Sequence, residues 1–300
     1  MKKFLSILLV LVISISLSFS AGTKENVEIS NSISIIDSYN REVEIPYNPS
    51  RIISLGPNIT EIISELNINK LIGRTDYCDY PTQVLSLDSI GNLTNPNLEK
   101  IIELNPDLVI GSVHCSLEVL ENLENLNIPA IAIYDDNNIE GSYNIITRIG
   151  KIINEEAKAN QIVKNNKELV ASIVNRTKDL ETKSVYYVVS FGSWGDFTCG
   201  GDTYIGKMFD LISADNIAKD IKGWNYSLEQ LIEKDPDIII VSKYYDTKNQ
   251  FISTYPYSTL KAVKNNNVYE IDNNLLDRQG VRNAQGLLEL AKIIYADEFK

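Results

Sequence analysis

The chain has 300 residues, of which 44% are hydrophobic and 23% are charged, and these proportions are typical of a globular protein with one large or two ordinary domains. Its formal net charge of −12 argues against a nucleic-acid binder, because phosphate binding needs basic side chains and the sequence has no basic stripe. Three cysteines, Cys78, Cys115 and Cys199, are an odd number and include no CxxC pair, so they do not make a disulfide framework.

The first twenty residues have the pattern of a secretory signal peptide. Two lysines precede an apolar run from Phe4 to Phe19, and the small residues near Ser20 and Ala21 are placed for cleavage. The run, about 16 residues long, is short for a bilayer span. Since no cysteine lies near the cleavage point, we predict a free periplasmic protein without a lipid anchor.

Strands and helices alternate through the first half of the mature chain. Asn58 and Glu61 have the spacing of a capping box at the start of the first helix. The predicted elements are RIISL (51–55), the helix PNITEIISEL (57–66), KLIGRT (70–75), a strand near 85–90, a helix at 98–104, DLVIG (107–111), a helix near 117–126 and AIAIY (130–134). This alternation predicts a parallel sheet covered by helices on both faces.

An internal repeat predicts a second lobe of the same kind. Residues 98–111 read LEKIIELNPDLVIG, and residues 228–241 read LEQLIEKDPDIIIV. Each copy predicts an amphipathic helix, a turn containing proline that ends it, and a fully apolar strand. The second lobe begins with SVYYVVSF at residue 184 and alternates again to the C-terminus.

Residues 155–183 contain neither glycine nor proline, and their apolar residues recur at helical spacing. We predict one long rigid helix that joins the lobes, since a flexible linker would be rich in glycine and serine. The predicted fold is therefore α/β, with two related Rossmann-like lobes, one interlobe helix and a ligand cleft between the lobes. The predicted parts are a signal peptide (1–20), an N-terminal lobe (21–154), the helix (155–183) and a C-terminal lobe (184–300).

Aromatic and polar residues gather in the segments that follow predicted strands, where open α/β sheets bind ligands. These segments hold both tryptophans, Trp194 and Trp224, as well as all three cysteines and the single histidine, His114. We therefore expect an aromatic-lined cleft. Tyr244 and Tyr245 directly follow a strand, and the sequence does not decide which of them faces the cleft.

From about Ile35 onward, the chain resembles the class III periplasmic binding proteins of ABC importers, which deliver cobalamin, haem and iron–siderophore chelates. It is most similar to the cobalamin-binding branch. The resemblance rests on SYNREVEIP, RIISLGPNITEI, GRTDYCDYP, NLEKIIELNPDLVIG, GGDTYIGKMFDLISADNIA, GWNYSLEQLIEKDPDIII and VYEIDNNLLDRQGVR. It implies a non-catalytic, monomeric receptor that feeds a membrane permease and its ATPase. It also implies a metal chelate as the transported ligand and no permanently bound cofactor.

The resemblance also implies roles for individual residues. Tyr77, Trp224 and Arg278 fall on the positions that contact ligand in the family. Glu99 and Glu229, which occupy matching places in the internal repeat, fall on the surface glutamates that pair with arginines of the permease. A first-turn carboxylate is also favoured by the helix dipole, which is the alternative explanation for either glutamate.

A second class of function remains open from the residues alone. An exported α/β enzyme could use the cysteine, histidine and aspartate groups of the cleft, and His114 with the three cysteines could hold a soft metal. Their spacing matches no metal motif, and we expect neither a catalytic nor a metal site. The sequence leaves open the role of these four residues and the choice among cobalamin, haem and a ferric siderophore.

Overall fold

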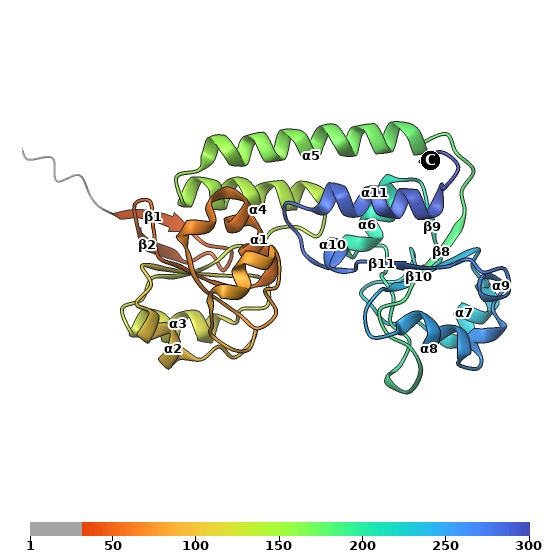
Figure 1. Cartoon of the computed structure of the whole chain (residues 1–300), viewed down its shortest axis with the longest axis horizontal. Helices are drawn as coiled ribbons and strands as arrows, with labels where there is room; N and C mark the ends of the chain where they lie inside the picture. Colours follow the sequence, from red (N-terminus) through yellow and green to blue (C-terminus); the bar gives the residue numbers. More distant parts are fainter. Residues whose placement is uncertain (1–31) are drawn as a thin grey trace, which may run out of the picture. The chain divides into compact units, whose positions relative to one another are not determined.

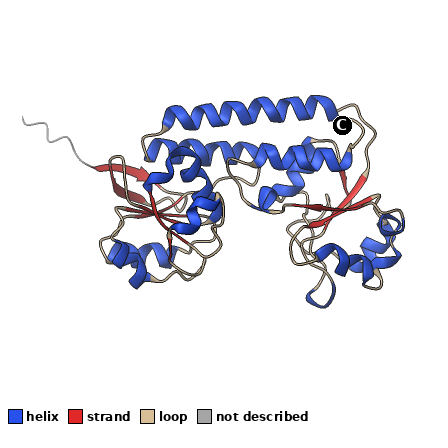
Figure 2. Ribbon diagram, in the orientation of Figure 1, coloured by secondary structure: helices blue, strands red, loops and turns tan. Residues whose placement is uncertain are grey.

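The computed structural model describes residues 32–300, so the predicted signal peptide lies outside the described residues. An antiparallel hairpin of β1 (Ser32–Ile36) and β2 (Glu42–Pro46) leads into two sheets, each all-parallel and flanked by helices (Figure 1; Figure 2). Within residues 32–300, no helix combines the length and the apolar character that crossing a membrane requires.

The first sheet has the strand order β5-β4-β3-β6-β7. Its strands are β3 (Ile52–Leu55), β4 (Leu71–Arg74), β5 (Asp88–Ser89), β6 (Leu108–Gly111) and β7 (Ala130–Ala132), and its helices are α1 (Pro57–Asn67), α2 (Leu98–Leu104), α3 (Leu117–Asn125) and α4 (Ile139–Ile152). Alternate strand residues form two cores. Ile52 packs with α1 and α4, whereas Ile53 packs with α2 and α3, as expected of strands buried on both faces.

The second sheet has the order β11-β10-β8-β9 and also two cores. Its strands are β8 (Ser184–Tyr187), β9 (Asp215–Asn216), β10 (Ile238–Ser242) and β11 (Val268–Ile271), and its helices are α6 (Tyr204–Leu211), α7 (Leu228–Lys234), α8 (Thr247–Ser253), α9 (Lys261–Lys264), α10 (Asn274–Asp277) and α11 (Asn283–Ile294). Short 3₁₀ helices lie at Ile68–Lys70, Thr82–Ser86, Gly192–Trp194 and Tyr257–Thr259.

The internal repeat is confirmed at the level of single contacts. Helices α2 and α7 both end in a residue with left-handed backbone, Asn105 (φ 46°) and Asp235 (φ 40°). The repeated aspartate after each proline fastens its strand to the start of the neighbouring one. Asp107 accepts hydrogen bonds from the backbone N–H and hydroxyl of Ser50, and Asp237 accepts the same two from Ser184. The two lobes therefore share a local structure as well as a sequence pattern.

The predicted joining helix is α5 (Glu156–Thr177), six residues shorter at its C-terminal end than predicted. It packs along α4 of the first lobe and α11 of the second (Figure 1). Ala159 near its start belongs to a core of the first lobe, and Ile173 near its end belongs to a core of the second. The two-lobed α/β fold with one long joining helix is confirmed, while the proposed domain boundaries at 154/155 and 183/184 stay a prediction.

Candidate ligand-binding site

A pocket of about 630 Å³ is lined by loops that directly follow parallel strands of both sheets. The first lobe contributes residues after β3, β4 and β6, and the second contributes residues after β10 and β11. Representative lining residues are Asn58, Tyr77, His114, Tyr244 and Asn273. The strand-end rule for α/β sheets therefore located the pocket correctly. Its volume lies within the range of small-molecule sites.

Four of the predicted ligand-binding residues lie together at this pocket: Tyr77, Tyr244, Tyr245 and Arg278. Tyr77 is 53% exposed and Tyr245 is 91% exposed, so both rings are open to solvent from opposite lobes. Tyr244 is held more firmly, because its hydroxyl donates to Asp272 at 3.1 Å. Both residues of the Tyr244–Tyr245 pair therefore line the pocket, and Tyr245 is the more exposed of the two, with its ring tilted against that of Tyr244.

Neither tryptophan is among the described residues that line the pocket. Trp224 is 43% exposed in the segment before α7. Its carbonyl accepts from the N–H of Thr198, which places this segment beside the loop after β8. The side chain of Trp194 lies outside the described part of the structure. The roles predicted for both tryptophans stay predictions, and Tyr244 and Tyr245 are the second-lobe aromatic residues among the described residues that line the pocket.

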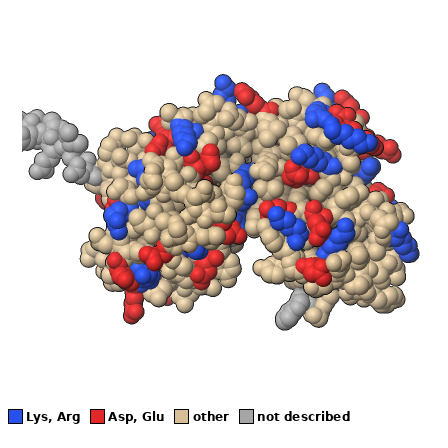
Figure 3. All heavy atoms as spheres, in the orientation of Figure 1, with Lys and Arg blue, Asp and Glu red and all other residues tan. Residues whose placement is uncertain are grey.

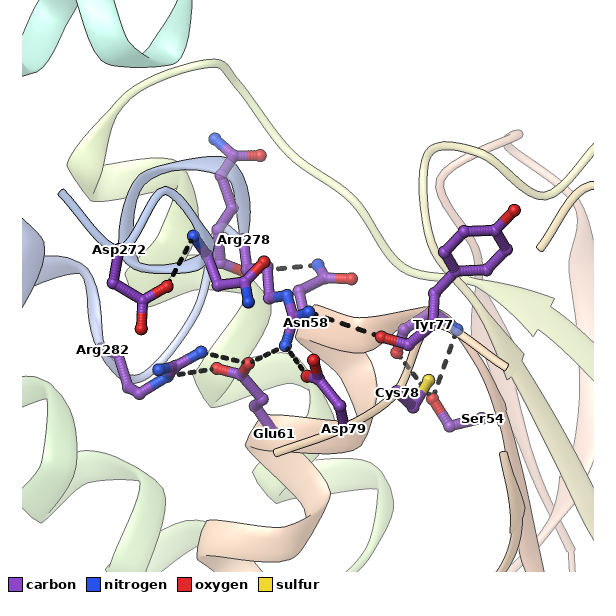
Figure 4. A network of polar contacts seen from close by, with 12 residues as sticks. Ser54, Asn58, Glu61, Tyr77, Cys78, Asp79, Asp272, Arg278 and Arg282 are labelled. Atoms are coloured by element: carbon purple, nitrogen blue, oxygen red, sulfur yellow. Dashed lines mark hydrogen bonds and ion pairs between the residues drawn. The ribbon is translucent and has the colours of Figure 1, made fainter. Parts of the chain in front are cut away.

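Arg278 is engaged by protein carboxylates. Its Nη1 donates to Glu61 Oε1 at 2.8 Å and to Asp79 Oδ1 at 2.7 Å, and its side chain is only 10% exposed. Glu61 also accepts from Arg282, through Nε at 2.8 Å and Nη2 at 2.5 Å. Figure 4 shows Glu61 between the two arginines, with Asp79 on the far side of Arg278. This network, Glu61–Asp79–Arg278–Arg282, ties α1 and the loop after β4 to the segment between α10 and α11.

The predicted capping box at the start of α1 is wrong. The helix begins at Pro57 with Gly56 as its N-cap residue, and no side chain caps it. The carboxylate of Glu61 is turned to the two arginines instead, and it is 1% exposed. Sequence reasoning missed Glu61 and Arg282 as partners. The available signal was a single carboxylate within the apolar run ITEII, together with two arginines four residues apart.

In the TDYCDYP loop, residues 75–81, some side chains line the pocket and one is buried away from it. Tyr77 and Asp79 line the pocket, and Asp76 lines it too while accepting a hydrogen bond from Ser89. Cys78 points the other way. Its sulfur is fully buried and lies 3.2 Å from the hydroxyl of Thr75. In Figure 4 the ring of Tyr77 points away from both this sulfur and the network around Arg278. The loop therefore presents an aromatic ring and carboxylates rather than a thiol.

The three cysteines are buried and separate. Burial raises the pKa of the Cys78 thiol, raises that of Cys115 to about 11 and raises that of Cys199 to about 12. A thiol with a raised pKa stays protonated at neutral pH, and only the thiolate is a good nucleophile or metal ligand. Among residues 32–300, no group of three or more His, Cys, Asp or Glu side chains is placed to hold a metal ion.

The charged lining of the pocket is mostly acidic. Asp76, Asp79 and Asp277 contribute carboxylates, while Arg278 is already bound to Glu61 and Asp79. His114 also lines the pocket and is exposed. Figure 3 shows acidic and basic side chains interspersed over the face in view, without a continuous basic area on it. The carboxylates therefore set the local charge at the pocket.

Glu99 and Glu229 occupy equivalent places on α2 and α7. Each lies in the first turn of its helix and is exposed, and each helix is capped by the residue two positions earlier, Asn97 or Ser227. The neighbouring Lys100 forms ion pairs with Glu103 and Asp88. Among the residues that the structure describes, no cation lies within ion-pair distance of either glutamate. Both charges are therefore available to a partner.

Comparison with known proteins identifies relatives over almost the whole described chain. The periplasmic binding protein family matches residues 52–275. An uncharacterized ABC transporter substrate-binding lipoprotein, YvrC of Bacillus subtilis (strain 168), is 34% identical over 276 residues, which cover 89% of this chain and 87% of the relative. The vitamin B12-binding protein of Vibrio parahaemolyticus is 24% identical over 246 residues, which cover 81% of this chain and 88% of that one.

Solved structures have the same fold. A possible iron-binding, periplasmic solute-binding protein from Staphylococcus epidermidis ATCC 12228 superposes with a TM-score of 0.72 and 29% identity, covering 83% of this chain and 99% of that one.

Proposed function

This chain belongs to the periplasmic binding protein family, and we propose that it captures a bulky metal chelate outside the cytoplasm and delivers it to the permease of an ABC importer. The observation that carries the proposal is the pocket at the strand ends of both lobes, with an exposed tyrosine from each, Tyr77 and Tyr245. Flat rings of this kind can stack on a macrocycle or an aromatic chelator. The role is binding rather than catalysis, in keeping with substrate-binding relatives.

The charges of the pocket favour one class of chelate. The lining carboxylates repel the propionates of haem and the negative charge of a ferric tricatecholate, because like charges at short range are unfavourable. A corrinoid presents neutral amides, and a ferric hydroxamate can be neutral or cationic. We therefore place cobalamin-type and hydroxamate chelates ahead of haem and catecholates.

The partners in this proposal are a permease and an ATPase in the membrane. Glu99 and Glu229 supply one exposed carboxylate per lobe, and neither has an ion-pair partner among residues 32–300. Two such groups suit a permease dimer that presents the same basic pocket twice. We further propose that the protein acts as a monomer outside the cytoplasm, with its signal peptide cleaved near Ser20 and Ala21.

The direct test is titration of the purified protein with cyanocobalamin, ferrioxamine, haem and a ferric tricatecholate. Intrinsic fluorescence of the two tryptophans serves as one readout and calorimetry as the other. Micromolar or tighter binding of any one chelate supports the proposal. Binding of none of the four, by a protein that unfolds cooperatively, contradicts it.

Replacing Tyr77 by alanine is expected to weaken chelate binding by about tenfold. An aromatic contact is worth about 0.5–1.5 kcal/mol beyond the area it buries, and 1.4 kcal/mol corresponds to a factor of ten. Tyr245→Ala should have a similar effect from the other lobe. Cys78→Ser is the neighbouring control, because its sulfur is buried beside Thr75. Loss of binding in Cys78→Ser with full binding in Tyr77→Ala would show that the loop acts through its thiol.

Replacing Asp76 by asparagine is expected to reduce the difference in affinity between anionic chelates and neutral or cationic ones. One exposed charge contributes about 0.2–1 kcal/mol, so the ratio of dissociation constants for haem and cyanocobalamin should fall by up to about fivefold. Asp220→Asn removes the same charge from an exposed position that does not line the pocket. An equal shift in both variants would assign the effect to net charge rather than to the pocket.

A further inference from the structure

Two exposed isoleucines occupy matching places in the two lobes. Ile102 on α2 is 48% exposed and Ile232 on α7 is 43% exposed. They are equivalent positions of the internal repeat, as are Glu99 and Glu229. A single exposed apolar side chain is ordinary in a soluble protein. Here, however, the exposure recurs at the same position of two separate helices.

The helices themselves do not need these side chains for their own cores. The residues just before them, Ile101 and Leu231, are fully buried and anchor α2 and α7 to their sheets. Ile102 and Ile232 lie outside these cores and remain about half exposed. Residues three apart lie on the same face of a helix, so each isoleucine lies one turn from the exposed glutamate of its helix. Each lobe therefore presents a carboxylate and an apolar side chain together.

We infer that Ile102 and Ile232 are the apolar half of the surface that docks on the permease, with Glu99 and Glu229 as the charged half. This inference rests on the proposed function and names further contact residues for its membrane partner. Two equivalent patches fit a partner with two-fold symmetry, whose subunits each present a basic group beside an apolar surface. A charged contact fixes register and speeds encounter, whereas apolar burial slows dissociation.

The first test places a photo-crosslinking amino acid at one position at a time in the intact bacterium. The test positions are 102 and 232, the reference positions are 99 and 229, and the control positions are 36 and 269, which carry one exposed apolar residue per lobe outside α2 and α7. Mass spectrometry identifies each adduct. The inference expects adducts with an integral membrane permease from 102 and 232, and none from 36 and 269.

The outcomes separate this inference from the proposed function. Permease adducts from 99 and 229 but not from 102 and 232 overturn the inference and leave the receptor role intact. No permease adduct from any of these four positions overturns both the inference and the docking role of Glu99 and Glu229, whereas chelate capture is tested separately by the titration. Permease adducts from the control positions at equal yield also overturn the inference, because the contact would then lack a defined face.

A second measurement uses the permease and ATPase complex that the crosslinking identifies. Binding of the double variant Ile102→Ser/Ile232→Ser to that complex is expected to be about tenfold weaker, since two partly buried side chains lose most of their apolar surface. Ile102→Val/Ile232→Val should restore most of the affinity, because it removes only one methylene from each side chain. Unchanged affinity in the serine variant overturns the inference.

Discussion

Replacing Glu61 by alanine is expected to lower the free energy of unfolding by about 3–5 kcal/mol. Removing one partner of a buried ion pair has this cost because the other charge stays buried without compensation. Here two charges are left, since Glu61 is 1% exposed and its partners Arg278 and Arg282 are 10% and 12% exposed. Arg278 keeps Asp79 as an ion-pair partner, so Arg282 loses more of its charge compensation than Arg278 does.

Denaturant unfolding, followed by circular dichroism, measures this change, and Glu65→Ala is the matched control. Glu65 lies one turn further along α1 and is exposed, so its removal should change stability by no more than about 0.5 kcal/mol. Glu61→Gln keeps the shape but not the charge and should fall between the two. A loss below 1 kcal/mol in Glu61→Ala would mean that the network does not hold α1 to the segment between α10 and α11.

The same network bears on ligand choice. The resemblance to the cobalamin-binding branch implied that Arg278 contacts ligand, and the arginine does line the pocket. Its Nη1 is shared by Glu61 and Asp79, however, so an anionic ligand must compete with two carboxylates already in place. A neutral chelate need not compete. The contacts of Arg278 thus point in the same direction as the surplus of lining carboxylates.

The features that could be predicted from sequence are those set by neighbours in the chain. The repeated helix–turn–strand follows from apolar periodicity and from the proline that ends each helix, and both copies fold as expected. The pocket could be located because parallel strands carry their carboxyl ends to one edge. The loop that carries Tyr77 and the Tyr244–Tyr245 pair could therefore be placed at the pocket without knowing any contact between the lobes, although the sequence did not decide between the two second-lobe tyrosines.

The Glu61–Arg278 pair was not predictable in this way, because 217 residues separate its members. Local pattern also misled, since Asn58 and Glu61 have the spacing of a capping box while the carboxylate binds arginines of the other lobe. Trp224 shows the same limit. It follows β9, which lies at the opposite edge of the second sheet from β10 and β11, and the residues after β10 and β11 line the pocket instead.

The largest functional effect is expected from the double variant Glu99→Ala/Glu229→Ala, which should abolish transport while leaving chelate affinity unchanged. The two carboxylates lie on α2 and α7 and do not line the pocket. Charged pairs across an interface set the register of docking, and removing one partner of a buried pair costs about 2–5 kcal/mol. Losing both lobes' charges removes both anchor points of a two-fold contact.

Whole-cell uptake of the chelate that binds best, measured beside calorimetry on the purified variants, separates docking from binding. Glu168→Ala/Glu270→Ala removes the same two charges from exposed positions on α5 and β11 and should transport normally. Each single variant, Glu99→Ala or Glu229→Ala, keeps one anchor and should retain part of the uptake. Because the two helices are structural copies, the single variants should be impaired to a similar degree. Full uptake in the double variant would remove the docking role, whereas a large difference between the single variants would mean that the two lobes do not meet equivalent pockets.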